Sequence, residues 1–247
     1  MVEKTCQQEI TIGFADVDYR ERLRPFRLFE LLEDVADVHA NMLRVGAQSE
    51  VMEGYVWVVA RNRYHLDRMP KLGEKLIIKT WPGCCHRAIY PRMFALIDGE
   101  GTQIGGVHSI WTLLDIKKQR LAANPEINAM FPDTSDLGIP VEAPGKLKQP
   151  VPTQPERFYI PAYSDLDRNR HVNNARYISW ICDCFDPKRY EDQTILDLEI
   201  NYLQQAFAGE EVCLQIQDEK EKFLIQGSDK QTGVALFRAA GTFGYSE

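Results

Sequence analysis

The 247-residue sequence has no Cys-x-x-Cys pair and no apolar run near the ~20 residues that cross a bilayer. Its six cysteines are scattered over the chain as Cys6, Cys84, Cys85, Cys182, Cys184 and Cys213. Without paired spacing they frame no zinc site, so we expect free thiols in a reducing compartment. The opening residues, MVEKTCQQEITIGF, contain no apolar segment of a secretory signal. We therefore expect a cytoplasmic protein without stable membrane insertion and without a bound metal.

Basic residues are also in short supply, because 29 Lys and Arg face 36 Asp and Glu, for a net charge of −7. A broad basic surface for nucleic acid is thereby excluded. The sequence has no Gly-x-Ser-x-Gly elbow of a serine hydrolase, and GEGTQIG departs from the dinucleotide-binding fingerprint after its second glycine. No cofactor is expected. The composition, 44% hydrophobic and 26% charged, is that of an ordinary globular chain that can build a core.

What the sequence does contain is one pattern that occurs twice. Each half has a strand-like stretch, then a segment of helical periodicity, then strand-like stretches rich in β-branched and aromatic residues. In the first half the strands are expected at 8–14, 55–65, 74–81, 88–98 and 103–115, and the helix at 28–43. In the second half the strands are expected at 158–163, 194–204, 211–217, 222–228 and 234–245, and the helix at 175–185.

The two halves align without a gap where ADVDYRERLRPFRLFEL lies over SDLDRNRHVNNARYISW, which indicates an internal duplication. Between the halves, residues 117–155 hold seven of the thirteen prolines, a composition typical of an extended linker on the surface. We therefore expect an N-terminal domain over residues 1–116, a proline-rich linker over 117–155 and a C-terminal domain over 156–247.

The stretch SDLDRNRHVNNARYISW, residues 164–180, concentrates hydrogen-bonding side chains directly before a helix. Asn173 or Asn174 is expected to cap that helix, but capping needs only one or two such side chains. The other polar residues therefore require a second explanation.

A calcium loop does not explain them. Asp165, Asp167 and Asn169 have the spacing of its first, third and fifth ligands. The sixth position should be Gly and is Arg170, and the twelfth should be Glu and is Arg176. Both changes remove what the metal needs, so calcium binding is disfavoured.

A catalytic role explains them better. Alternate residues of an extended segment point the same way, so Asp167, Asn169 and His171 would line one side of the chain just before a helix N-terminus. The partial positive charge of that terminus favours a developing oxyanion, and the three side chains are those that carbonyl hydrolysis needs. The first half has Asp18, Arg20 and Arg22 at the same positions. One copy is therefore expected to be specialised for chemistry.

This stretch resembles the active-site segment of acyl-acyl-carrier-protein thioesterases, which release free fatty acids at the end of fatty acid synthesis. WVVARNRYHLDRMPKLGEKLIIKTWP and GGVHSIWTLLD are similar to matching parts of the family's first unit. The resemblance implies an α+β fold, the tandem hot-dog, with a continuous antiparallel sheet wrapped around two central helices. It also implies hydrolysis of acyl thioesters on acyl carrier protein. An acyl-coenzyme A thioesterase and an acyl-binding protein without catalysis are the alternatives.

The resemblance assigns Asp167, Asn169 and His171 to catalysis, and we expect Gln205, Asn173 and Asn174 to bind substrate or position water. The family has a Glu, followed in plant members by a Cys, where this sequence has Gln205 and Ala206. A Cys–His nucleophilic mechanism therefore has no support here. Whether Asp167 or His171 is the general base is left open by the sequence.

The resemblance also implies where the substrate would lie. The acyl chain is expected beside the first helix, in the N-terminal domain. An acidic carrier protein would need a local basic face on this acidic chain. The candidates are Arg61, Arg63, Arg68 and Lys71, or Arg168, Arg170 and Arg176. A homodimer is left open.

Overall fold

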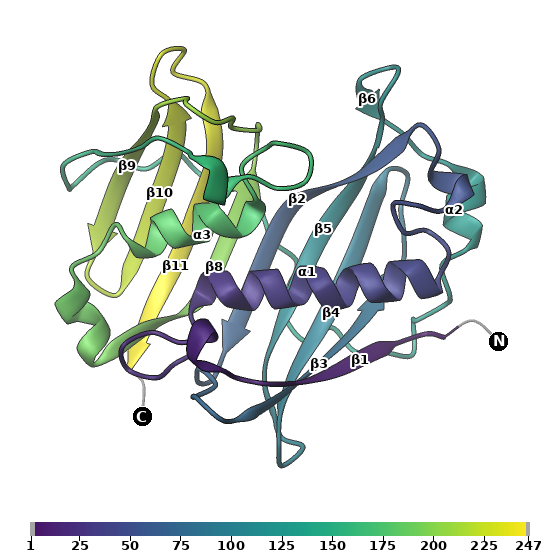
Figure 1. The fold of residues 1–247 in the computed structure, drawn as a ribbon, viewed down its shortest axis with the longest axis horizontal. Helices are drawn as coiled ribbons and strands as arrows, with labels where there is room; N and C mark the ends of the chain where they lie inside the picture. The colour runs from purple at the N-terminus through teal and green to yellow at the C-terminus, as the bar shows by residue number, and fades with distance from the viewer. Residues whose placement is uncertain (1–2, 246–247) are drawn as a thin grey trace.

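The computed structural model describes residues 3–245, and within that range eleven strands form one antiparallel sheet with two long helices against one face (Figure 1). The N-terminal unit contains β1 (Cys6–Thr11), β2 (Tyr55–Leu66), β3 (Lys75–Pro82), β4 (Ile89–Asp98) and β5 (Gln103–Asp115). The C-terminal unit contains β7 (Arg157–Tyr159), β8 (Gln193–Tyr202), β9 (Val212–Glu219), β10 (Lys222–Asp229) and β11 (Ala235–Tyr245).

The order of the strands shows the duplication directly. It runs β1-β3-β4-β5-β2 through the first unit and β8-β11-β10-β9-β7 through the second. The equivalent strands therefore occur in the opposite order in the two units. They join where Arg61 to His65 of β2 pair antiparallel with Asp197 to Asn201 of β8. The expected tandem hot-dog with a continuous sheet is confirmed.

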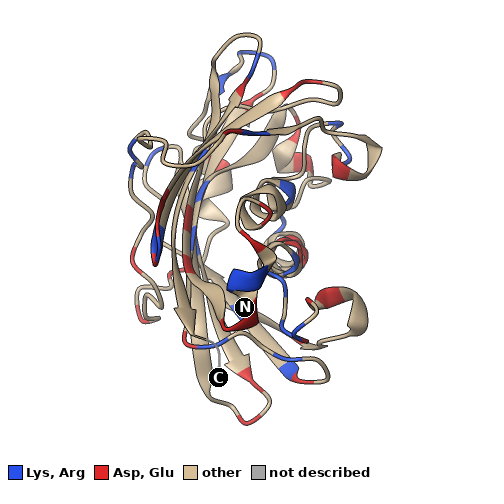
Figure 2. Cartoon of the chain, turned by 90° about the vertical axis from the view of Figure 1, so that its left-hand side faces the viewer, with Lys and Arg blue, Asp and Glu red and all other residues tan. Residues whose placement is uncertain are grey.

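The helices α1 (Pro25–Met42) and α3 (Asn174–Cys182) lie on the same face of the curved sheet, as Figure 2 shows, and contact each other. Pro25 suits the first position of α1, since that position needs no N–H donor. Leu28 and Val35 of α1 and Ile178 of α3 are fully buried, so the apolar stripe of each helix faces the sheet. Burying each such side chain contributes about 1.5–3 kcal/mol.

A matched ion pair in each unit supports the alignment of the two halves. Asp16 Oδ1 accepts from Arg27 Nε at 2.7 Å, and Asp165 Oδ1 lies 3.2 Å from Arg176 Nε. Both aspartates end short 3-10 turns that precede a long helix.

The short helices are η1 (Phe14–Asp16), η2 (Glu50–Met52), η3 (Tyr163–Asp165), η4 (Pro187–Glu191) and α2 (Pro125–Ala129).

One expected strand is much shorter than predicted. The stretch 158–163 forms a strand only to Tyr159, and the turn η3 begins at Tyr163. Pro161 lies between them, and proline has no N–H for a strand ladder.

The segment between the units is not extended throughout, contrary to the expectation. It contains β6 (Arg120–Leu121), which pairs with β5, and α2, which buries Ile127. Asn124 caps α2 by accepting hydrogen bonds from backbone amides of its first turn. Further on, the chain crosses the face of the sheet away from the helices, where the Asn201 side chain donates to Gly145 O at 3.0 Å. Most of residues 142–155 are exposed.

Candidate active site

The loop before α3 is held by the carboxylate of Asp167. Its Oδ1 accepts hydrogen bonds from the backbone amides of Asn169 at 2.8 Å and His171 at 3.0 Å. Its Oδ2 lies 3.4 Å from Asn169 Nδ2. The turn also places Arg170 at φ 64°, in the left-handed region. Asp167 therefore fixes the backbone positions of both other proposed catalytic residues.

The first unit builds the same turn with its own aspartate. Asp18 Oδ1 accepts from the backbone amides of Arg20 at 2.8 Å and Arg22 at 3.0 Å, and Glu21 has φ 58°. The aspartate is thus part of the loop's architecture in both units. Among the three proposed catalytic positions, the two that distinguish the units are those of Asn169 and His171.

The residues that follow β8 lie beside this loop. The backbone of His171 forms an isolated bridge with Phe207, and Val172 N donates to Ala206 O at 2.9 Å. The His171 ring stands edge-on to the Phe207 ring, with 5.2 Å between centroids. Gln205 precedes this contact and is exposed. The structure therefore brings the segment of Gln205 to the loop.

The N-terminus of α3 completes the site. Asn173 is the N-cap, because its side chain accepts from Ala175 N at 2.8 Å, which confirms one of the two residues expected to cap the helix. Asn174 is the first helical residue, and its backbone N–H has no hydrogen-bond acceptor within residues 3–245. A free amide at a helix N-terminus can donate to a carbonyl oxygen that becomes an oxyanion.

Three further residues of this region carried no clear signal in the sequence. The carboxyl group of Glu33, on α1, lies beside the side chains of Asn174 and Asn173. Burial raises the pKa of Glu33 to about 7, and the nearby charges of Asp34 and Glu30 add to the effect. On the helix wheel Glu33 looks like an ordinary polar position at the edge of the apolar stripe.

The other two line the sheet under the helices. Tyr202 of β8 donates from its hydroxyl to Asn174 O at 3.3 Å, and burial followed by the charge of Glu33 raises the pKa of that hydroxyl. Asn62 of β2 lies beside the Tyr202 hydroxyl, and its Oδ1 is buried without a partner in the described part of the chain. These groups extend the polar site from the loop into the seam between the units.

The equivalent place in the first unit is closed. Arg22, at the position of His171, is buried and pairs with Asp18 Oδ2 at 3.0 Å. Its guanidinium also donates to Gln193 O at 3.1 Å and to Tyr190 O. These carbonyls belong to the second unit, so Arg22 ties the units together where the second unit keeps a polar, partly exposed loop.

The structure also bears on the other chemistry considered above. All six cysteines are free thiols, as expected, and Ala206 is fully buried. Among residues 3–245, no cluster of three His, Cys, Asp or Glu side chains is arranged to hold a metal ion. Over the same residues, no helix combines the length and apolar character needed to cross a membrane.

The fold and this site define a two-unit hot-dog protein with one polar loop at a central helix N-terminus. Residues 3–131 match the family model of the acyl-ACP thioesterase N-terminal domain, and residues 149–243 match that of the C-terminal domain. The chain therefore belongs to the acyl-ACP thioesterase family.

Solved structures and curated relatives agree with this assignment. An acyl-ACP thioesterase from Bacteroides thetaiotaomicron superposes with a TM-score of 0.90 at 26% identity, over 98% of each chain. The 12:0-ACP thioesterase from Umbellularia californica shares the fold, with a TM-score of 0.85 at 18% identity over 100% of this chain and 99% of that one. A chloroplastic palmitoyl-acyl carrier protein thioesterase from Cuphea hookeriana is 28% identical over 60% of this chain and 37% of its own length. The chain spans less than half the length of the curated relatives that it matches.

Proposed function

We propose that this chain hydrolyses fatty acyl thioesters of acyl carrier protein and releases the free fatty acid. The observation that carries the proposal is the match of both units to the family, together with a polar loop at the N-terminus of α3. Acyl thioester hydrolysis needs donors for the oxyanion and side chains that hold a water, and the loop offers both.

In the proposed mechanism the thioester carbonyl lies over the start of α3. Its oxygen accepts a hydrogen bond from the backbone N–H of Asn174. Asp167 keeps Asn169 and His171 in position through Oδ1, while its Oδ2 lies 3.4 Å from Asn169 Nδ2. Asn169 and Gln205 orient the attacking water, and His171 donates a proton to the departing thiolate. Asn173 and Asn174 shape the carbonyl pocket.

We further propose that residues 1–116 hold the acyl chain against α1 and that residues 156–247 carry the catalysis, joined by 117–155. Each methylene buried from water contributes about 0.8 kcal/mol, so the depth of that apolar pocket would set the preferred chain length. The cytoplasm is the proposed compartment, in agreement with six free thiols.

Of the two basic faces considered, the structure favours the one around the active-site loop. Arg63 and Arg68 of the first candidate face are engaged in ion pairs with acidic side chains. In the second face Arg176 is paired with Asp165, whereas Arg168 and Arg170 are exposed on the loop itself. We therefore propose that the acidic carrier protein docks there.

Reversing the charge of that face should weaken docking without affecting chemistry. The double variant Arg168→Glu/Arg170→Glu is expected to raise KM for the acyl-carrier substrate by about tenfold at low salt, with kcat within threefold. KM for the matching acyl-coenzyme A should change less. Arg20→Glu, an exposed arginine on the equivalent loop of the first unit, is the matched control. An equal rise of KM in the control would contradict docking at the second loop.

The function itself is tested with matched acyl-carrier and acyl-coenzyme A thioesters, following release of free thiol. A higher kcat/KM for the carrier substrate supports the proposal. A preference for the coenzyme A substrate would make the chain an acyl-coenzyme A thioesterase. Tight binding without turnover would make it an acyl-binding protein.

A further inference from the structure

A carboxyl group lies in the seam between the units, next to the first residue of α3. It belongs to Glu33 of α1, and its neighbours are the side-chain amides of Asn173 and Asn174. The hydroxyl of Tyr202 and the side chain of Asn62 continue the same polar cluster on the sheet.

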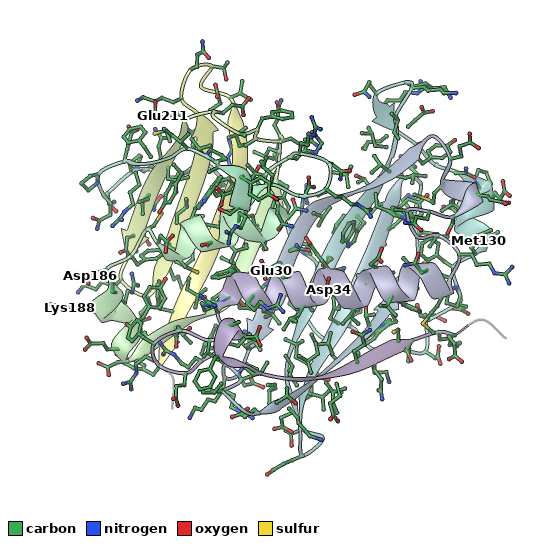
Figure 3. The ribbon with its side chains drawn as sticks, viewed as in Figure 1. Glu30, Asp34, Met130, Asp186, Lys188 and Glu211 are labelled. Atoms are coloured by element: carbon green, nitrogen blue, oxygen red, sulfur yellow. The ribbon has the colours of Figure 1, made fainter. Side chains whose placement is uncertain are left out.

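This flank of α1 faces α3, and its residues Phe26 and Glu33 are both half-buried. Phe26 lies two helical turns before Glu33, and the guanidinium of Arg176 of α3 stands 6.0 Å from the centroid of its ring. Residues seven apart share one side of a helix, so Glu33 reaches toward α3 as Phe26 does. Figure 3 labels its neighbours Glu30 and Asp34 on the same helix.

The surroundings of Glu33 do not compensate its charge. In the described chain it forms no ion pair, and the neighbouring charges that raise its pKa, those of Asp34 and Glu30, are both acidic. The facing groups on α3 and β8 are neutral amides and a phenol. Glu33 is half-buried. Withdrawing a carboxylate from water without a cation is costly, and groups with such perturbed acidity gather at functional sites.

The family position that would carry a second carboxylate holds Gln205 in this chain, and an amide cannot accept a proton. Asp167, the carboxylate of the loop, has Oδ1 committed to two backbone amides, as Asp18 has in the closed first unit. Glu33 therefore carries the one carboxyl group of the described site that does not hold the backbone of the loop in place.

We propose, resting on the proposed thioester hydrolysis, that Glu33 is the general base of this active site and is supplied to the second unit's loop by the first unit's helix. Glu33 takes a proton from water as the water oxygen bonds to the thioester carbonyl carbon, and the oxyanion forms at the amide of Asn174. Collapse of the intermediate breaks the C–S bond. The thiolate leaves with a proton from His171. Glu33 then gives its proton to solvent, and His171 takes up a proton from solvent, so both residues return to their starting states.

The test compares Glu33→Gln with the wild type on the acyl-carrier substrate across pH 5 to 9. Loss of the base should lower kcat by at least ~10²-fold at pH 8, with KM within threefold. The wild type should lose activity below a pH of about 7, where Glu33 becomes protonated, and the variant should lack this acidic limb. Asp34→Asn, a change on an exposed neighbour, is the matched control and should keep kcat within twofold.

A stability measurement on the same proteins needs no turnover. The pKa of Glu33 is about 7 in the folded chain and 4.5 as its ordinary value, so its contribution to stability is complete below 4.5 and is lost as pH rises through 7. The wild type should therefore fall in Tm relative to Glu33→Gln between pH 5 and 8. A parallel pH dependence of the two Tm values would contradict a carboxyl held in this seam.

The outcomes separate this proposal from the proposed function. If the wild type turns over the acyl-carrier thioester and Glu33→Gln does so within threefold, the role of Glu33 is overturned while thioester hydrolysis stands. The role is also overturned if Asp34→Asn loses as much activity as Glu33→Gln. If the folded wild type turns over neither thioester, the proposed function fails and Glu33 has no reaction to serve.

Discussion

Asp167→Ala is expected to lower kcat by at least ~10²-fold while the protein stays folded. The alanine removes the acceptor that holds the backbone amides of Asn169 and His171 at 2.8 and 3.0 Å. Without it the loop relaxes, and a displacement of about 1 Å in a catalytic group can cost 10²-fold in rate. The measurement is kcat on the acyl-carrier substrate, with circular dichroism to show that the fold is retained.

Two further variants show whether the loop or the charge matters. Asp167→Asn keeps an oxygen acceptor and should lose only about tenfold, because its oxygen can still hold the turn. Asp18→Asn changes the same turn in the first unit and should leave kcat within threefold. A loss in Asp167→Asn as large as in Asp167→Ala would assign proton removal to Asp167 and contradict the role given to Glu33.

Arg22→Met is expected to lower the free energy of unfolding by about 3–5 kcal/mol, the usual cost of removing one partner of a buried ion pair. The change leaves Asp18 without its cation and frees the carbonyls of Tyr190 and Gln193 in the second unit. Unfolding in urea measures the difference, because the midpoint shifts while the slope is unchanged.

Arg20→Ala is the control for that experiment. Arg20 is two residues away on the same loop and is exposed, so its loss should change stability by no more than about 0.5 kcal/mol. A change below 1 kcal/mol in Arg22→Met would contradict the view that this arginine joins the units.

Much of the fold could be predicted from the sequence because the pattern occurs twice. The strand predicted at 103–115 has the bounds of β5, because the turn glycines Gly99 and Gly101 precede a stretch that contains several β-branched and aromatic residues. The helix expected from 175 begins at Asn174, where Asn173 caps it. The strand order came from the family resemblance, because periodicity says nothing about which strands are neighbours.

The parts that were missed depend on contacts between distant segments. Helical periodicity cannot tell whether Glu33 faces solvent or α3, because the neighbour belongs to the other unit. Arg22 looked like one of several loop arginines, and only the packing of η4 and β8 against it buries its charge. The duplication indicated that the fold does not require the polar residues of the second loop. The shared turn shows that the aspartate is required in both units, as Asp18 in the first and Asp167 in the second.

The most direct test of the account is the rate of free fatty acid release from a long-chain acyl carrier protein by the wild type and by Asn169→Ala/His171→Ala. At these two positions the first loop has Arg20 and Arg22 instead. We predict turnover by the wild type and a rate at least ~10²-fold lower in the double variant, with an unchanged fold. Equal rates in the two proteins would place the chemistry elsewhere, and no release by the folded wild type would contradict thioester hydrolysis altogether.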